Sequence, residues 1–194
     1  MKKLLIASRN KGKISEIKHT LADMGYEILS LNDVPGDEAK KEVEEPAMTY
    51  EGNAIIKAMT IGQRFKMLDD TGLEIDALDG RPGVNSARYA DGTTEGRNKS
   101  VLEEMEDVAD DKRTARFTSV IAIYNPETEK VMTCEGRIEG VINREPKGEN
   151  GFGYDPIFYV PKLGKTLAEI TFSEKSLYDH RARAMEKVKE FLLE

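Results

Sequence analysis

The stretch KLLIASRNKGKISEIK, residues 3–18, joins a short apolar run to a cluster of basic residues. Lys3–Ala7 has the length and continuous apolar character of a buried strand. Ile14, Ile17 and Leu21 then recur at helical spacing. The chain is therefore predicted to open with a strand, a tight turn containing glycine, and a helix.

Strands and helices continue to alternate, and strands cluster later in the chain. The next expected elements are a strand at YEILSL, a helix from Thr49, a strand FKML ending at Asp69-Asp70, and a separate strand through Leu73, Ile75 and Ala77. A helix over Glu95–Met105 is expected to follow. The last expected elements are two or three antiparallel strands over 115–142, joined at Asn125-Pro126, and an amphipathic helix over Asp179–Leu193. This order predicts an α/β protein with a mixed central sheet and flanking helices. No linker interrupts residues 1–194, so one domain is expected.

The composition excludes several functional classes. The 194 residues include 36 acidic and 29 basic side chains, a net charge of -7, which disfavours binding to nucleic acids or anionic membranes. A single cysteine, Cys134, excludes an intrachain disulfide framework and is expected to be buried and inert. No apolar run reaches the ~18 residues of a membrane span, and the apolar start is too short for a signal peptide, so a cytoplasmic protein is expected.

The basic cluster at the start of the first helix suits an anion. Backbone N–H groups and the positive end of the helix dipole attract phosphate, Ser8 and Asn10 add short donors, and Lys13 adds a charge. Ile14 follows Lys13, where a Walker loop requires Ser or Thr. A phosphate site and a merely solvated basic face both remain open.

Carboxylates gather at Glu45 and at Asp69-Asp70. Adjacent carboxylates are costly unless a cation compensates them, and such oxygen ligands suit Mg²⁺. The alternative is that Asp69 and Asp70 only decorate a turn.

Three further segments carry polar or aromatic side chains that suit a nucleotide. In GRPGVNSARYA, Ser86 and Arg88 are able to reach an anion, or the segment is a structural turn with Arg88 in an ion pair. In GFGYDP, Phe152 and Tyr154 offer a face for a flat ring and Asp155 accepts hydrogen bonds, or both aromatics belong to the core. The third segment contains Lys175 and, at the start of the last helix, Asp179 as N-cap followed by His180 and Arg181 as donors, although a histidine there is often only solvated.

The sequence resembles the inosine/xanthosine triphosphate pyrophosphatases. The matching blocks are SRNKGKISEI, TYEGNAIIKA, DDTGLEIDALDGRPGVNSARYA, GFGYDPIF, GKTLAEI and EKSLYDHRARAM, in family order from residue 8 to the final helix. It departs from the usual family pattern at Arg9, where small residues are common, and at Asp179, where serine is common.

The resemblance implies a two-lobed α/β fold with the active-site cleft between the lobes, a homodimer, and Mg²⁺ as cofactor. It implies catalysis by Asp70, Lys13 and Glu45, with Asp70 and Glu45 as metal ligands. The residues expected to bind the substrate phosphates are Ser8, Arg9, Asn10, Lys11, Gly12, Lys13, Lys57 and Thr71. Those expected to bind the base or ribose are Phe152, Gly153, Tyr154, Asp155, Lys175, His180 and Arg181. Asp69, Ser86 and Arg88 are secondary candidates.

The implied reaction is hydrolysis of ITP, dITP and XTP to the monophosphate and pyrophosphate, which removes non-standard purines from the nucleotide pool. Phosphoryl transfer requires alignment and charge neutralisation, which lysines and a metal ion supply. Two alternatives remain: a general nucleotide phosphatase with little base preference, and a nucleotide sensor that does not hydrolyse its ligand.

Overall fold

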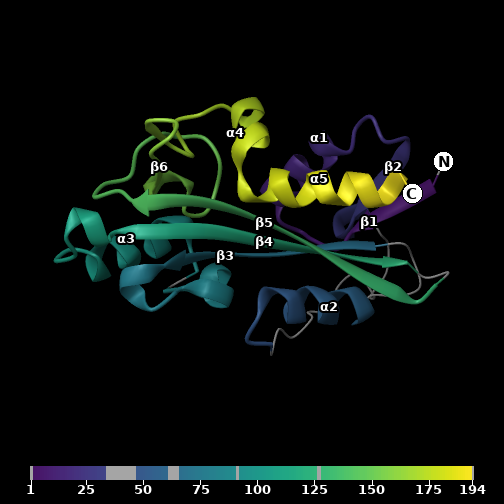
Figure 1. Ribbon diagram of the computed structural model, residues 1–194, viewed down its shortest axis with the longest axis horizontal. Helices are drawn as coiled ribbons and strands as arrows, with labels where there is room; N and C mark the ends of the chain where they lie inside the picture. The colour runs from purple at the N-terminus through teal and green to yellow at the C-terminus, as the bar shows by residue number, and fades with distance from the viewer. Residues whose placement is uncertain (1, 34–46, 61–65, 91, 126–127, 194) are drawn as a thin grey trace. The chain divides into compact units, whose positions relative to one another are not determined.

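The computed structural model describes residues 2–33, 47–60, 66–90, 92–125 and 128–193, without the side chains of residues 2, 57–60 and 66 (Figure 1). The helices are α1 (Lys11–Thr20), α2 (Tyr50–Thr60), α3 (Thr94–Glu104), α4 (Phe172–Tyr178) and α5 (His180–Leu193). The strands are β1 (Lys2–Ile6), β2 (Tyr26–Ser30), β3 (Lys66–Ile75), β4 (Thr114–Asn125), β5 (Lys130–Ile142), β6 (Phe158–Val160) and β7 (Lys165–Thr166). None of the helices in these ranges combines the length and apolar character needed to cross a bilayer.

The seven strands form one sheet in the order β2-β1-β3-β4-β5-β6-β7. β1 pairs in parallel with both β2 and β3, whereas β6 pairs antiparallel with β5 and β7. The sheet is therefore mixed, and the predicted α/β class is confirmed. Because β2 and β3 flank β1 on opposite sides, the strand order reverses direction at β1.

The chain divides into two compact units, as expected for two lobes. Unit 1 comprises residues 1–70, 119–136 and 181–194, and unit 2 comprises residues 71–118 and 137–180. Strands β3, β4 and β5 contribute residues to both units. The expected cleft between the lobes remains a prediction.

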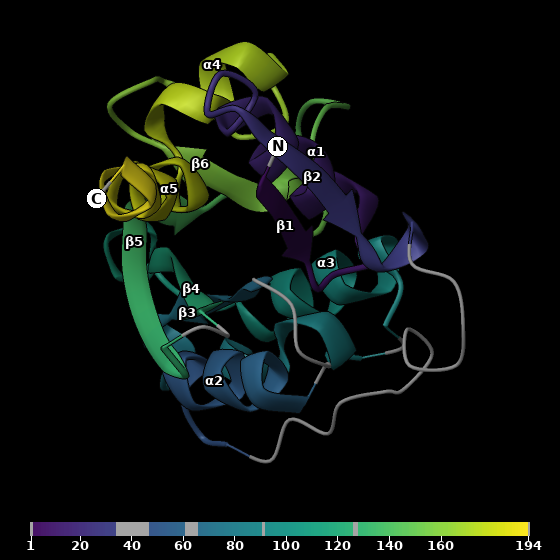
Figure 2. The same cartoon turned by 90° about the vertical axis from the view of Figure 1, so that its right-hand side faces the viewer.

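Unit 1 has apolar cores on both faces of its strands. Ile17 of α1 and Met185 of α5 pack in one cluster with Leu4 and Ile6 of β1. On the opposite face, Ala54 of α2 packs with β3 and β4 (Figure 2). Burial of each large aliphatic side chain contributes about 1.5–3 kcal/mol, so packing against the helices holds β1 in the centre of this unit.

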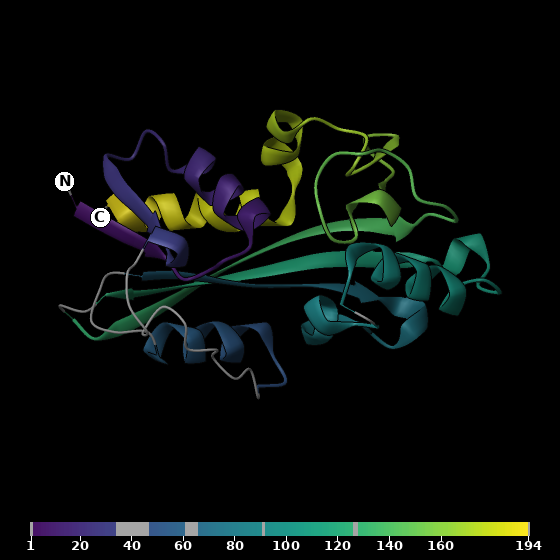
Figure 3. The ribbon, with the colours of Figure 1, turned by 180° about the vertical axis from the view of Figure 1, so that it is seen from behind.

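Unit 2 has a separate core formed by its parts of the long strands, α3 and β6 (Figure 3). Leu73 and Ile75 of β3, Val101 of α3, and Phe117 of β4 belong to this cluster together with Phe158 of β6. The Phe117 and Phe158 rings lie 4.7 Å apart at a tilted angle. α3 is thereby packed against the strands of this unit.

Several expected boundaries were wrong. β3 is one continuous strand, so Asp69 and Asp70 lie within it and not at its end, because a buried ion-pair network compensates Asp69. Gly12 lies inside α1 and not in the turn, because Asn10 caps the helix that begins at Lys11. The short α4, β6 and β7 were not predicted from the sequence.

Asp179 lies between α4 and α5, directly before the last helix. Its φ of -75° and ψ of 170° are extended, so α4 ends at Tyr178 and α5 begins at His180. The predicted start of the final helix is confirmed to within one residue.

Cys134 lies in the unit 1 core with 5% of its surface exposed. Burial raises the pKa of its thiol above the usual value, which disfavours the reactive thiolate. We expect no reaction of the folded protein with Ellman's reagent at pH 8, and one thiol per chain after unfolding in guanidinium chloride. Rapid reaction of the folded protein would contradict this burial.

Candidate active site

The carboxyl end of β1 is the point where the strand order reverses. The Ala7 N–H donates to the Met67 carbonyl at 2.9 Å, and the Ser8 N–H donates to the Ile6 carbonyl at 2.8 Å. Residues 7–10 therefore leave β1 beside the part of β3 that precedes Asp69. Open α/β sheets bind ligands outside the carboxyl ends of their strands at such a reversal.

The N-terminus of α1 begins directly after this segment. The Asn10 side-chain oxygen accepts from the Lys13 N–H at 3.1 Å, and the Ser8 hydroxyl accepts from the Asn10 N–H at 3.2 Å. The first turn contains Lys11 and Lys13 and no acidic residue. Backbone donors, the helix dipole and two lysines thus give this helix end a positive potential.

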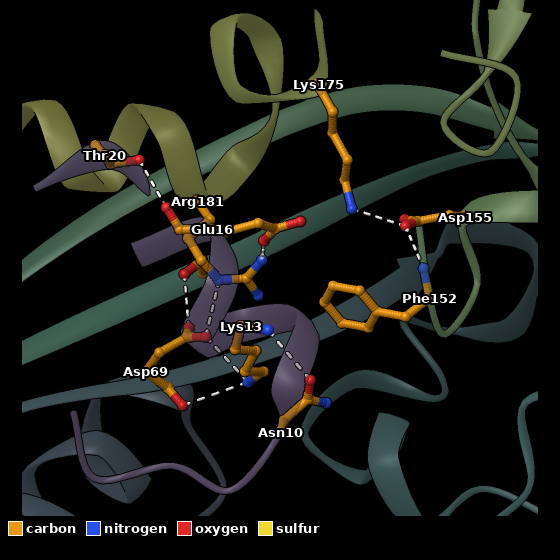
Figure 4. A network of polar contacts seen from close by, with 10 residues as sticks. Asn10, Lys13, Glu16, Thr20, Asp69, Phe152, Asp155, Lys175 and Arg181 are labelled. Atoms are coloured by element: carbon orange, nitrogen blue, oxygen red, sulfur yellow. Dashed lines mark hydrogen bonds and ion pairs between the residues drawn. The ribbon is translucent and has the colours of Figure 1, made fainter. Parts of the chain in front are cut away.

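Asp69 is the buried centre of a polar network in unit 1 (Figure 4). Its carboxylate accepts from Ser119 Oγ at 2.8 Å and from Arg181 Nε at 3.0 Å, and it pairs with Lys13 Nζ at 3.1 Å. Lys13 Nζ also donates to the Asp69 carbonyl at 3.4 Å. A buried carboxylate is stable only with such partners, so Asp69 fixes both cations.

Glu16 of α1 completes the network and was missed in the sequence. Its carboxylate forms an ion pair with Arg181, whose side chain is 2% exposed. The network therefore joins two acidic side chains, Glu16 and Asp69, to two basic ones, Lys13 and Arg181, so that their charges cancel. The one feature of the sequence that could have indicated the burial of Glu16 is its place between Ile14 and Ile17, which both lie on the buried face of the helix.

Asp70 follows on β3 and is 6% exposed. Successive side chains on a strand point to opposite faces, so its carboxylate is directed away from that of Asp69. Within the described ranges, no group of three or more His, Cys, Asp or Glu side chains is arranged to hold a metal ion. Mg²⁺ needs only one or two protein carboxylates when phosphates and water complete its shell, so Asp70 fits that role.

A second buried ion pair holds the GFGYDP segment in unit 2 (Figure 4). Asp155 Oδ2 accepts from Lys175 Nζ at 2.7 Å and from the Phe152 N–H at 2.8 Å. Lys175 Nζ lies 4.7 Å from the centroid of the Phe152 ring, a cation–π distance. A Cβ at Gly151 would lie 2.1 Å from Asp155 Oδ2, so this tight turn excludes other side chains there.

Tyr154 and Ser86 form a buried link within unit 2. The Tyr154 hydroxyl donates to the Ser86 carbonyl at 2.9 Å, and burial raises the pKa of Tyr154, so the hydroxyl remains a donor at neutral pH. Ser86 Oγ accepts from the Leu73 N–H at 2.8 Å and donates to the Gly83 carbonyl at 2.6 Å. This segment therefore ties the GFGYDP turn to β3.

His180 is 3% exposed, and its ring stacks on that of Phe117 at 4.8 Å with an interplanar angle of 19°. Phe117 was not among the residues predicted for the site. In the sequence, Phe117 is an aromatic residue within a predicted strand, and nothing distinguishes it from an ordinary core residue.

The remaining assigned residues divide between the two units. Ser8–Lys13, Asp69, Asp70 and Arg181 belong to unit 1. Thr71, Ser86, Phe152–Asp155, Lys175 and His180 belong to unit 2, as does Arg88, which is exposed. Glu45 lies outside the described residues, and the side chain of Lys57 lies outside the described atoms. The assigned roles of all these residues remain predictions.

A pocket with a volume of about 920 Å³ lies in unit 2 and borders the end of the GFGYDP segment at Pro156. Its described lining comes from α3, from Arg113 and from the segment between Arg144 and Pro156. It includes no residue assigned above, and three acidic side chains of α3 and its end offset its three basic ones. We therefore do not place a nucleotide there.

We expect Asp69→Asn to destabilise the protein by about 3–5 kcal/mol, because it leaves buried cations without their carboxylate. Urea unfolding followed by circular dichroism measures this change. Asp33→Asn is the matched control: Asp33 pairs with Lys18 and accepts from the Ser30 N–H and hydroxyl at an exposed site of the same unit, and its substitution is expected to destabilise the protein much less. Equal effects of the two substitutions would contradict the central role of Asp69.

Known proteins match this chain over nearly all of its length. The sequence model of the Ham1 family matches residues 4–191. A dITP/XTP pyrophosphatase of Halalkalibacterium halodurans is 45% identical, with 99% of this chain and all of the relative aligned. The dITP/XTP pyrophosphatase of Bacillus subtilis is 43% identical, with 99% and 98% aligned.

Solved structures give the same result. A HAM1 protein from Coxiella burnetii superposes with a TM-score of 0.87 at 38% identity, covering 100% of this chain and 99% of that one. A nucleoside-triphosphatase/dITP/XTP pyrophosphatase from Mycobacterium abscessus has a TM-score of 0.75 at 40% identity, with 96% and 98% covered. The family model, the full-length relatives and the solved structures all point to the same family, and the chain belongs to the Ham1 family.

Proposed function

We propose that this protein hydrolyses the non-standard purine nucleoside triphosphates ITP, dITP and XTP to the monophosphate and pyrophosphate, and so cleanses the nucleotide pool. The observation that carries the proposal is the 43–45% identity to dITP/XTP pyrophosphatases over nearly the full length of both chains. The geometry at the carboxyl end of β1 supports the chemistry.

The substrate phosphates bind at the N-terminus of α1. The backbone N–H groups at the start of the helix, together with Lys11 and Lys13, provide the positive potential that a triphosphate requires. Asp69 holds Lys13 Nζ in place, so this donor is oriented before the substrate arrives. Ser8, Arg9, Asn10 and Gly12 complete this segment, and Lys57 and Thr71 are proposed to contact the phosphates as well.

Asp70 is the proposed catalytic carboxylate and, with Glu45, a ligand for a divalent metal ion, for which Mg²⁺ is our assignment. A bound metal ion offsets phosphate charge and makes its water more acidic. Asp70 contributes a buried carboxylate that holds the metal ion and accepts a hydrogen bond from the attacking water. Lys13 stabilises the negative charge that develops on the pyrophosphate leaving group.

The base is proposed to bind in unit 2. The Phe152 ring offers a flat apolar surface, and Lys175 and His180 are donors toward the C6 oxygen of hypoxanthine or xanthine, where adenine carries an amino group. A site that binds a carbonyl oxygen through buried donors discriminates strongly against an amino group at that position. Gly153, Tyr154 and Asp155 shape this surface.

We also propose that residues 1–194 act as a single two-lobed domain with the active site between the lobes, as a cytoplasmic homodimer. The resemblance to the pyrophosphatase family supports this assignment. Size-exclusion chromatography with light scattering distinguishes a dimer from the 21.7 kDa monomer.

The decisive experiment incubates purified protein and Mg²⁺ with ITP, XTP, GTP and ATP in parallel and quantifies pyrophosphate and orthophosphate separately. We expect pyrophosphate, mainly from ITP and XTP. Orthophosphate, or equal rates on all four substrates, would instead indicate a general nucleotide phosphatase. Saturable binding of ITP without either product would indicate a sensor.

We expect Asp70→Asn to lower kcat for ITP by about 10²–10⁴-fold, the range for loss of a group that handles a proton in the transition state. Asp79→Asn is a matched control, because Asp79 is exposed in a turn whose positive φ of 54° also suits asparagine. Circular dichroism verifies that both variants are folded. Full activity of folded Asp70→Asn would refute the assigned role.

A further inference from the structure

α3 supports the GFGYDP segment through a buried side chain outside every block on which the family resemblance rests. Asn98, on the second turn of α3, is 5% exposed, and its Nδ2 donates to the Gly153 carbonyl at 3.2 Å. Thr93 caps this helix, its hydroxyl accepting from the Gly96 N–H at 3.0 Å. The donor on Asn98 therefore projects from a rigid, well-capped element.

The residue before Asn98 contacts the next residue of the same segment. The Arg97 guanidinium lies 5.7 Å from the centroid of the Tyr154 ring, and its Nη1 donates to the Ala87 carbonyl at 2.8 Å. Two consecutive residues of α3 thus engage the consecutive residues Gly153 and Tyr154. The segment is held from α3 as well as by the Lys175–Asp155 pair.

Asparagine is a costly choice for this position if its purpose is only to fill space. Its Oδ1 is buried with no hydrogen-bond partner among the described residues, which an apolar side chain of similar size would avoid. Among the described residues, its side chain donates to the carbonyl of Gly153, which has a φ of 65° and, as a glycine, has more backbone freedom than another residue would have. What Asn98 provides is therefore a fixed orientation of this peptide group.

The Gly153 carbonyl belongs to the peptide group that joins Gly153 to Tyr154, and Phe152 is linked to this group through the φ and ψ angles of Gly153. The orientation of the group therefore affects where the aromatic ring lies. The same ring lies under Lys175, and the Phe152 N–H is held by Asp155. A rotation at Gly153 therefore changes the position of the ring relative to Lys175.

We propose that Asn98 is a positioning residue that determines base selectivity, by fixing Gly153 and through it the Phe152 ring against Lys175. This inference rests on the proposed function of the same site. Asn98 does not touch the nucleotide; it acts through the backbone of the segment that does. Its removal leaves hydrolysis possible but allows the base surface to adjust to purines that it normally rejects.

The test compares kcat/KM for ITP with kcat/KM for GTP in Asn98→Ala, Asn98→Asp and the wild-type protein. Asn98→Asp keeps the volume but replaces the donor with a second acceptor toward the Gly153 carbonyl. The ratio of the two values is unaffected by the fraction of folded enzyme, so general destabilisation does not change it. We expect the ratio to fall about fivefold or more in both variants, as for loss of one hydrogen bond.

Val101→Ala is the matched control. Val101 is fully buried one turn further along α3, in the core cluster of unit 2, so its truncation lowers the melting temperature but keeps the Asn98 side chain that donates to Gly153. Gly153→Ala perturbs the same peptide group without altering α3; its Cβ meets no atom within 4 Å, but the positive φ disfavours alanine. We expect an unchanged ratio in Val101→Ala and a reduced one in Gly153→Ala.

An unchanged ITP/GTP ratio in both Asn98 variants would overturn the inference, even if their melting temperatures fall. An equal change in Val101→Ala would overturn it too, because the effect would then come from packing of α3. If the wild-type protein releases no pyrophosphate from ITP, the proposed function itself fails, and this result is obtained before any variant is compared.

Discussion

The buried carboxylate of Asp69 is the constraint on which unit 1 depends. Transfer of a charge into the protein interior costs several kcal/mol unless partners compensate it, and here the partners come from α1, β4 and α5. Segments far apart in sequence must therefore meet at one point of β3. As a consequence, the position of Lys13 at the start of α1 is fixed relative to the strand that carries Asp70. A salt bridge of this kind contributes little net stability, but it selects one arrangement of the elements around it.

Unit 2 uses the same device. Asp155 is 2% exposed, and it binds a lysine from α4 and a backbone N–H from its own turn. In each unit, then, a buried acid orders a lysine that the proposed reaction needs, at the phosphates in one case and at the base in the other. Lysine side chains lose much rotamer entropy when they are fixed. Because folding has already supplied that cost through the ion pairs, substrate binding does not have to supply it again.

The parts of this structure that follow from local periodicity were predictable from the sequence. The opening strand and helix, the long final helix and the mixed sheet follow from apolar spacing alone. The division of β3 into two strands was wrong, because Asp69-Asp70 looks like an interruption until Lys13 and Arg181, 56 and 112 residues away, are known to neutralise Asp69. Glu16 and Asn98 were missed for a related reason: a single polar residue on a helix gives no indication of the distant guanidinium or carbonyl that it binds.

The ion pairs that the buried cations already form also affect how a purine is recognised. Arg181 already binds Glu16 and Asp69, and moving it to a base would leave two buried carboxylates to be compensated again. Lys175 Nζ is an ammonium with three N–H donors, and it can turn a donor toward a base oxygen while it keeps its ion pair with Asp155 at 2.7 Å. Recognition by Lys175 and by His180, stacked on Phe117, therefore costs less than recognition by Arg181. Selectivity then depends on how firmly the Phe152 ring is held beside these donors, and that is set by elements behind the ring as much as by the residues that face the substrate.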